Sequence, residues 1–209
     1  MATSARHGAP DGDAQGVAGH FGLAAGVKAR ERAVPLWALM LATQWLDVVF
    51  VPLFIAKIET IEVIGGGKPG YGNGIIHANY THSLVGALVL ALVFALPAGL
   101  RWGRRAAVVL GAVVFSHWLI DLLVHHHDMP LFPGAPAGWP LFGFGLWRWP
   151  VVTAAAEAAL VLWGGFSYLR AAVEVARAHD PGKLRRARAA GVTVLAAGLL
   201  TLALNVAGL

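Results

Sequence analysis

Long apolar runs separated by short polar connections dominate this 209-residue chain. A helix needs about 20 apolar residues to cross the hydrocarbon core of a bilayer. Runs near that length lie at 34–56, 82–100, 106–124, 150–169 and 189–208. A further apolar run at 17–27 is too short to cross. The pattern therefore predicts an all-α, polytopic membrane helical bundle of about five transmembrane helices.

The composition supports a membrane protein and suggests one domain. The chain is 57% hydrophobic and 13% charged, whereas soluble domains carry about 25% charged residues. Residues 1–16 are small, polar and rich in Gly and Pro, so we expect a disordered amino-terminal tail and a single helical membrane domain over 17–209. The tail lacks the apolar segment of a secretory signal peptide. The absence of Cys excludes disulfides and thiolate metal ligands.

Lys and Arg alternate between rich and poor connections. They gather at 28–32, 101–105 and 170–188, while the connection after the first run balances Lys57 with Glu59. Cytoplasmic connections of membrane proteins carry an excess of Lys and Arg. We therefore expect a bacterial cytoplasmic (inner) membrane protein with its amino terminus inside and its carboxyl terminus outside. The net charge of +5 then reflects topology and not nucleic-acid binding, which needs a basic stripe on one face.

Several ionisable residues fall inside the apolar runs, where charge is costly and usually marks function. The expected topology places them at one depth near the outer face; they are Asp47, His82, His117, Asp121, His125 and Glu157. His117, Asp121 and His125 are spaced four apart, so they share one helix face over about 12 Å. That length favours Asp121 as a carboxylate shared between two ions, with one His for each.

Imidazole and carboxylate ligands without Cys favour a divalent transition metal, zinc before manganese or iron, bound as one or two ions. The predicted ligands are Asp47, His82, His117, Asp121 and His125. Glu157 or Asp128 is the candidate general base. Simpler interpretations remain open: a buried His117–Asp121 hydrogen bond, an interfacial His82, a packing role for Glu157 beside Arg148, and a turn that starts at Asp128.

A set of short segments resembles one known family. The segments are "GHFGLAAGVK" (19–28), "ATQWLD" (42–47), "THSL" (81–84), "SHWLIDLLVH" (116–125), "DMPLFPG" (128–134), "GFGLW" (143–147) and "AAAEAALVLWGGFSYLR" (154–170). Together they are similar to prokaryotic membrane-bound metal-dependent hydrolases, inner-membrane proteins with largely uncharacterised substrates. Arg148 departs from that family, where a small amide residue is more usual. The His-x3-Asp pair also looks like part of the zinc site of zinc-dependent phospholipase C and single-strand nucleases.

The resemblance implies that His20 joins the polar set. The span count instead places His20 on the inner side, away from the other residues, as a structural side chain. A re-entrant or interfacial helix over 17–33 would reconcile the two expectations.

These observations predict an integral-membrane, metal-dependent hydrolase. Its metal ion would activate water for attack on an ester or phosphoester at the outer face of the membrane. A site at bilayer depth suggests an amphiphilic or lipid-linked substrate. Two alternatives stay open: a transporter or permease that uses the same residues as an ion or proton pathway, and a non-catalytic, metal-stabilised membrane scaffold.

Overall fold

The structure is a computed structural model that describes residues 16–63, 74–136 and 138–207. It is 74% helical. The α-helices are α1 (Val17–Arg30), α2 (Leu36–Thr43), α3 (Trp45–Ile55), α4 (Leu84–Trp102), α5 (Arg104–Val124), α6 (Pro150–His179) and α7 (Leu184–Ala207). The short elements are β1 (Thr60–Val63), β2 (Gly74–His77), β3 (Met129–Pro130), β4 (Leu141–Phe142), and the 3-10 helices η1 (Leu146–Arg148) and η2 (Pro181–Lys183).

The expected helical bundle is confirmed. Four helices among the described residues are long and apolar enough to cross a membrane, namely α4, α5, α6 and η2 with α7. The pair α2 and α3 passes the same test as one span bent by 49°. The predicted run at 34–56 is therefore interrupted. The tail predicted at 1–16 lies almost entirely outside the described residues.

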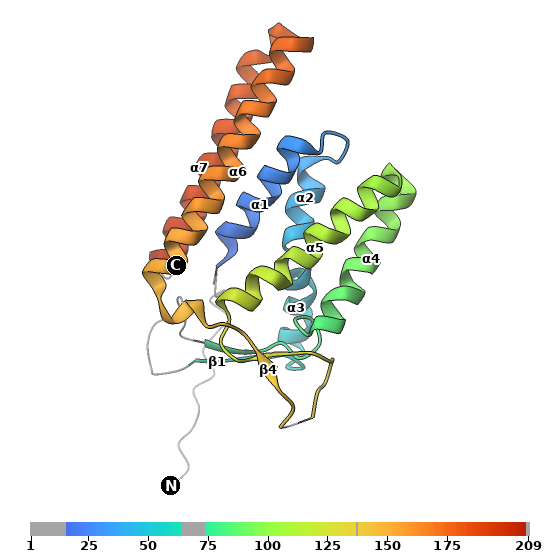
Figure 1. The fold of residues 1–209 in the computed structure, drawn as a ribbon, viewed down its shortest axis with the longest axis vertical. Coiled ribbons are helices and arrows are strands. Elements are labelled where there is room, and N and C mark those ends of the chain that lie inside the picture. Colours follow the sequence, from blue (N-terminus) through green and yellow to red (C-terminus); the bar gives the residue numbers. More distant parts are fainter. Residues whose placement is uncertain (1–15, 64–73, 137, 208–209) are drawn as a thin grey trace.

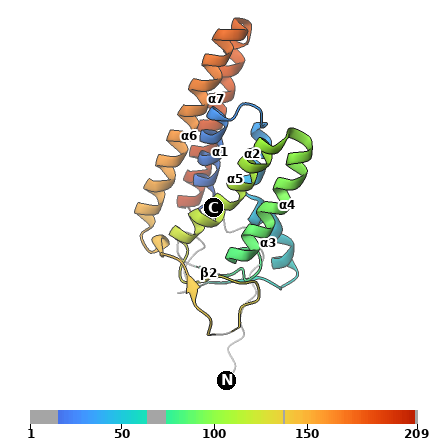
Figure 2. The same cartoon turned by 45° about the vertical axis from the view of Figure 1, so that its right-hand side comes forward.

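The helices form neighbouring pairs, with the small hairpins gathered at one end (Figures 1 and 2). Helix α6 packs along both α7 and α1, and α1 and α7 also contact each other. Helix α1 also contacts α2, and α5 contacts both α2 and α4. The antiparallel pairs β1–β2 and β3–β4 lie at the end opposite the turn between α6 and α7, which we call the hairpin end.

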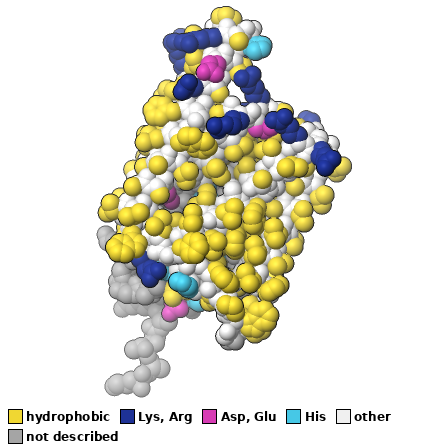
Figure 3. Space-filling view, viewed as in Figure 1, with side chains coloured by type: hydrophobic (Ala, Val, Ile, Leu, Met, Phe, Trp, Pro, Cys, Tyr) yellow, Lys and Arg dark blue, Asp and Glu magenta, His cyan; other side chains and the backbone are white. Residues whose placement is uncertain are grey.

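The three Lys- and Arg-rich connections meet at the other end, which we call the basic end. The space-filling view shows most of the Lys and Arg side chains there, above a broad apolar surface (Figure 3). Exposed members include Arg32, Arg104, Lys183 and Arg186. The alternation of charge in the sequence therefore corresponds to two chemically different ends of the bundle.

Helix α1 begins partway along the bundle, on the hairpin side, and ends toward the basic end (Figure 1). Its 14 residues span about 21 Å. Beyond its carboxyl end, Glu31 accepts a hydrogen bond from Nε of Arg105 at 2.7 Å, and Lys28 Nζ donates to the carbonyl of Val34 at 2.7 Å. Gly16 consequently lies on the hairpin side, whereas the topology predicted from the charges places the amino terminus at the basic end; residues 1–15 lie outside the described chain.

Two glycines allow α1 and α6 to touch through their backbones. A Cβ added to Gly164 would lie 1.8 Å from the carbonyl oxygen of Gly22, and one added to Gly22 would lie 2.5 Å from that of Leu160. Small residues let helices in membranes approach this closely. The contact fixes the position of α1, which carries His20.

A Gly164→Ala substitution should destabilise the protein by about 1–3 kcal/mol, because the methyl group overpacks the contact between α1 and α6. Thermal unfolding of the detergent-purified variant measures this. Gly182→Ala is the matched control, since a Cβ there meets only the side chain of Asp180, at 3.3 Å. Equal stability of the two variants would contradict the predicted contact.

Candidate metal centre

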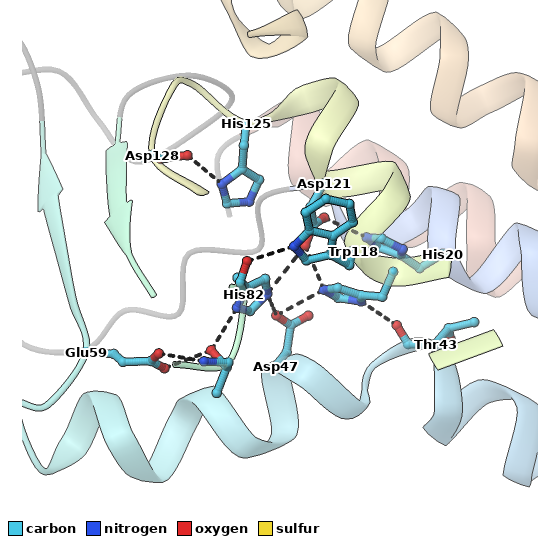
Figure 4. Close-up of polar contacts among 11 residues, drawn as sticks. His20, Thr43, Asp47, Glu59, His82, Trp118, Asp121, His125 and Asp128 are labelled. Carbon is cyan, nitrogen blue, oxygen red and sulfur yellow. Dashed lines mark hydrogen bonds and ion pairs between the residues drawn. The ribbon is translucent and has the colours of Figure 1, made fainter. Parts of the chain in front are cut away.

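Five ionisable side chains from four segments of the chain converge in the half of the bundle nearer the hairpins (Figure 4). They form two overlapping groups that could hold a metal ion, His20–His117–Asp121 and Asp47–His82–His117. We call these residues the five-residue cluster. His20 comes from the first turns of α1, Asp47 from α3 and His82 from the segment before α4. His117 and Asp121 both come from α5.

The two carboxylates lie between the three imidazoles. Asp121 Oδ1 is 3.3 Å from Nε2 of His20, and its Oδ2 is 3.0 Å from Nε2 of His117 and 3.4 Å from that of His82. Asp47 Oδ1 is 3.4 Å from Nε2 of His82 and 3.5 Å from that of His117. Ligand atoms about 2.0–2.1 Å from a tetrahedral zinc ion are separated by about 3.3 Å, so these spacings match a ligand set.

The break between α2 and α3 orients His117. Helix α2 ends at Thr43, and Gln44 leaves the helical conformation with φ −112° and ψ 6°. The Thr43 carbonyl accepts a hydrogen bond from Nδ1 of His117 at 2.6 Å. A carbonyl oxygen only accepts, so Nδ1 carries the proton. In the neutral ring Nε2, which faces the carboxylates, then holds a lone pair.

The Thr81 hydroxyl orients His82 in the same way that the Thr43 carbonyl orients His117. Thr81 Oγ1 lies 2.8 Å from Nδ1 of His82 and donates its own proton to Glu59 at 2.8 Å. Because that hydroxyl has only one proton, it accepts from Nδ1. Trp118 Nε1 donates to the His82 carbonyl at 2.8 Å and holds the backbone. When they are neutral, His82 and His117 therefore both direct an unprotonated Nε2 toward the carboxylates of Asp47 and Asp121.

Lone pairs facing carboxylate oxygens repel unless a cation lies between them. Two protons or one divalent ion would supply the same charge. His82 lies two residues before α4, outside the candidate spans. Burial opposes its charged form, but hydrogen bonds and charges from Asp121 and Asp47 outweigh this and raise the pKa of His82 to about 9. The rings of His20 and His117 stack at 4.1 Å, which disfavours charging both.

The donor set fits a transition metal. Imidazole nitrogen with carboxylate oxygen suits zinc, iron or manganese, and partners on the outer nitrogens of ligand histidines are usual in metal sites. His117 belongs to both groups and its Nε2 binds a single ion, so the geometry favours one ion in the cluster. The structure thus brings together four predicted ligands and His20.

The expectation from the span count that His20 lies away from the cluster is wrong, and the role implied by the resemblance agrees with its position. Its Nε2 lies 3.3 Å from Asp121, and only 3% of the residue is exposed. The span count failed because α1 does not cross the bundle. It begins beside the cluster and ends toward the basic end. The apolar run at 17–27, although too short to span a membrane, therefore places His20 in the cluster.

His125 does not share the helix face predicted for it with His117 and Asp121. Helix α5 ends at Val124, and His125 adopts an extended conformation with φ −59° and ψ 152°. Its Nδ1 bonds to Asp128 Oδ1 at 3.1 Å. The ring lies 4.3 Å from the ring of Trp147 and 6.1 Å from that of His82. Among the described residues His125 joins neither metal group, so the arrangement with Asp121 shared between an ion at His117 and an ion at His125 is not formed.

The two candidate bases lie around the cluster. Asp128 is 4% exposed; it bonds to His125 and accepts the Ile76 backbone N–H at 3.0 Å, which ties it to β2. Glu157 is 6% exposed and packs against the first turn of α1, since a Cβ added to Gly19 would lie 3.4 Å from its Cγ. Neither carboxylate belongs to the two metal groups.

Sequence reasoning missed Thr43 and Glu59. Thr43 acts through its backbone, and no residue type marks a carbonyl. Glu59 counted only as a loop charge that offsets Lys57, yet it is fully buried. The sole signal was its place shortly after an apolar run, which many exposed acids share.

Comparison of the chain with protein-family models, curated proteins and solved structures gives no match. The resemblance drawn from the short segments therefore stays a prediction, and the functional argument depends on the site itself.

Affinity for Zn²⁺ should fall as the pH is lowered from 9 to 6. A metal ion needs the neutral imidazole, whereas a pKa of about 9 keeps the metal-free His82 protonated below that pH, so binding must displace a proton. Chelator-competition titrations across this range measure the effect. An affinity that stays constant would contradict the arrangement of His82.

Proposed function

We propose that this protein is an integral-membrane, metal-dependent hydrolase that cleaves an ester or phosphoester of an amphiphilic or lipid-linked substrate. One observation carries the proposal. Three imidazole Nε2 atoms and two carboxylates converge at 3.0–3.5 Å in the bundle interior. Two of the imidazoles are held by partners on their outer nitrogens.

The five-residue cluster would hold the ion, with zinc the first choice. When bound, such an ion supplies Lewis acidity and activates water at neutral pH. The chain then has to carry protons to and from the reacting groups. His125 is suited to this, because it lies next to His82 and Asp128 orients its ring through Nδ1. Asp128 is thereby a positioning residue, and Glu157 remains the second candidate base.

The exposure of Asp47 supports a lipid-like substrate. Its side chain is 40% exposed, compared with 2–7% for the other members of the cluster. Residues 47, 51 and 55 share one face of α3, on which Val51 is 52% and Ile55 73% exposed. Exposed apolar side chains on a membrane helix face lipid. An acyl chain could therefore lie along α3 while its polar group reaches Asp47.

The charge distribution supports an orientation with the basic end in the cytoplasm of a bacterial cell. The cluster then lies in the outer half of the membrane. The buried apolar residues Leu39, Leu110 and Val114 lie in the helices between the cluster and the basic end, which supports a site closed toward the cytoplasm.

Purified protein should bind about one divalent ion per chain, and Asp121→Asn should lower Zn²⁺ affinity at least tenfold, because Asp121 contacts all three imidazoles. Elemental analysis and calorimetric titration measure both. The control is His77→Gln on β2, whose imidazole is 45% exposed and lies 3.4 Å from Glu62, outside both metal groups. Metal-free wild-type protein that takes up no Zn²⁺ would refute the proposed centre.

The metal-loaded protein should hydrolyse a lipid phosphoester or ester in mixed micelles, and EDTA should abolish the activity. His125→Gln should lower the rate by about 10²–10⁴-fold while metal content is retained, since general acid–base groups contribute that much. Long-chain substrates should react faster than water-soluble short-chain analogues. Loss of metal from the His125 variant would instead make His125 a ligand.

The break between α2 and α3 also favours a second candidate, a metal or proton transporter. Discontinuous helices line the ion sites of many transporters. Uptake of Zn²⁺ into proteoliposomes under a pH gradient, without hydrolysis of any lipid, would support it. The apolar residues between the cluster and the basic end count against a continuous pathway.

A further inference from the structure

Glu59 occupies an unusual position for an acid in a short connection at the end of a membrane bundle. It is fully buried, although it immediately precedes β1 and its neighbours Ile58 and Thr60 are exposed. A buried carboxylate is costly unless hydrogen bonds satisfy it. Its partners therefore show what the protein gains by burying it.

Both oxygens of Glu59 bind the segment that carries His82. Oε1 accepts the backbone N–H groups of Tyr80 at 2.8 Å and Thr81 at 2.9 Å. Oε2 accepts the hydroxyl proton of Thr81 at 2.8 Å. The same hydroxyl oxygen lies 2.8 Å from Nδ1 of His82. A continuous chain of hydrogen bonds thus runs from Glu59 through Thr81 to His82 (Figure 4).

The direction of this chain is set by Glu59. Oε1 accepts the two backbone N–H groups and Oε2 accepts the Thr81 hydroxyl, whose single proton therefore points toward Glu59. The hydroxyl oxygen can then only accept from Nδ1 of His82. This leaves the lone pair of the neutral ring on Nε2, which faces Asp47 and Asp121.

We infer that Glu59 is a positioning residue for the metal centre, which selects through Thr81 the tautomer of His82 that can bind a metal ion. The inference rests on the proposed metal centre and adds to it a residue outside the cluster. Substitution of a residue that orients a ligand histidine commonly lowers metal affinity about 10–100-fold.

Glu59→Gln tests the direction of the chain with almost no change of shape. The backbone N–H groups of Tyr80 and Thr81 require an oxygen, so they hold the amide oxygen in place and turn its NH₂ group toward Thr81. The NH₂ group donates, the hydroxyl must then donate to Nδ1 of His82, and the proton of the neutral ring moves to Nε2. That tautomer cannot bind a metal ion through Nε2.

The experiment measures Zn²⁺ affinity and the visible spectrum of the Co²⁺-loaded full-length protein in detergent. Glu59→Gln should weaken Zn²⁺ binding at least tenfold and change the Co²⁺ absorption bands, because one nitrogen ligand is lost. The matched control is Glu62→Gln, which removes an exposed acid from β1 and should leave both unchanged. A role limited to holding the backbone predicts wild-type behaviour for Glu59→Gln, since the amide oxygen keeps those bonds.

A second pair of variants keeps Glu59 and its backbone contacts, in case Glu59→Gln fails to fold. Thr81→Val removes the hydroxyl and should weaken binding like Glu59→Gln, whereas Thr81→Ser restores the hydroxyl and should recover affinity to within a few fold of wild type. Zn²⁺ affinities within twofold of wild type for Glu59→Gln, or for Thr81→Val where Glu59→Gln does not fold, overturn this inference alone. Absence of Zn²⁺ binding by wild-type protein overturns the proposed centre and this inference with it.

Discussion

The carboxylate of Asp121 is the constraint around which the bundle is organised. It lies inside an apolar helix, where an unpaired charge would cost several kcal/mol, and it is 5% exposed. Its two oxygens contact imidazoles from three separate segments of the chain. Two of those segments depart from a simple transmembrane helix: α1 has only 14 residues, and His82 lies before α4.

The two interruptions near the cluster have the same effect, which is to place backbone groups where they hold a histidine of the cluster. The break after Thr43 releases a carbonyl that holds His117, and the segment before α4 presents His82 with its backbone held by Glu59 and Trp118. Irregular backbone at membrane depth is tolerated where protein surrounds it. In this protein the Thr43 carbonyl orients His117, and the irregular segment before α4 presents His82 to the cluster.

Around the cluster the structure separates two kinds of histidine. His20, His82 and His117 direct Nε2 toward carboxylates, whereas His125 is held by Asp128 and packs against Trp147. A ligand needs a lone pair on a fixed nitrogen, and a proton carrier needs a ring that can exchange its proton. In the proposed hydrolase these different partners would suit the first three histidines to binding the ion and His125 to carrying a proton.

Hydropathy alone predicted the helices and a shared level for four residues that the structure does bring together. In the predicted topology the length of each apolar run sets where it would cross a membrane, so the positions of Asp47, His82, His117 and Asp121 along their runs indicated a common level. Tertiary contacts decided the rest. Whether His20 reaches the cluster depends on the packing of α1 against α6, and His125 leaves it because α5 ends one residue earlier. Glu59 matters only because folding buries it beneath Thr81, and hydropathy carries no information on such contacts between distant segments.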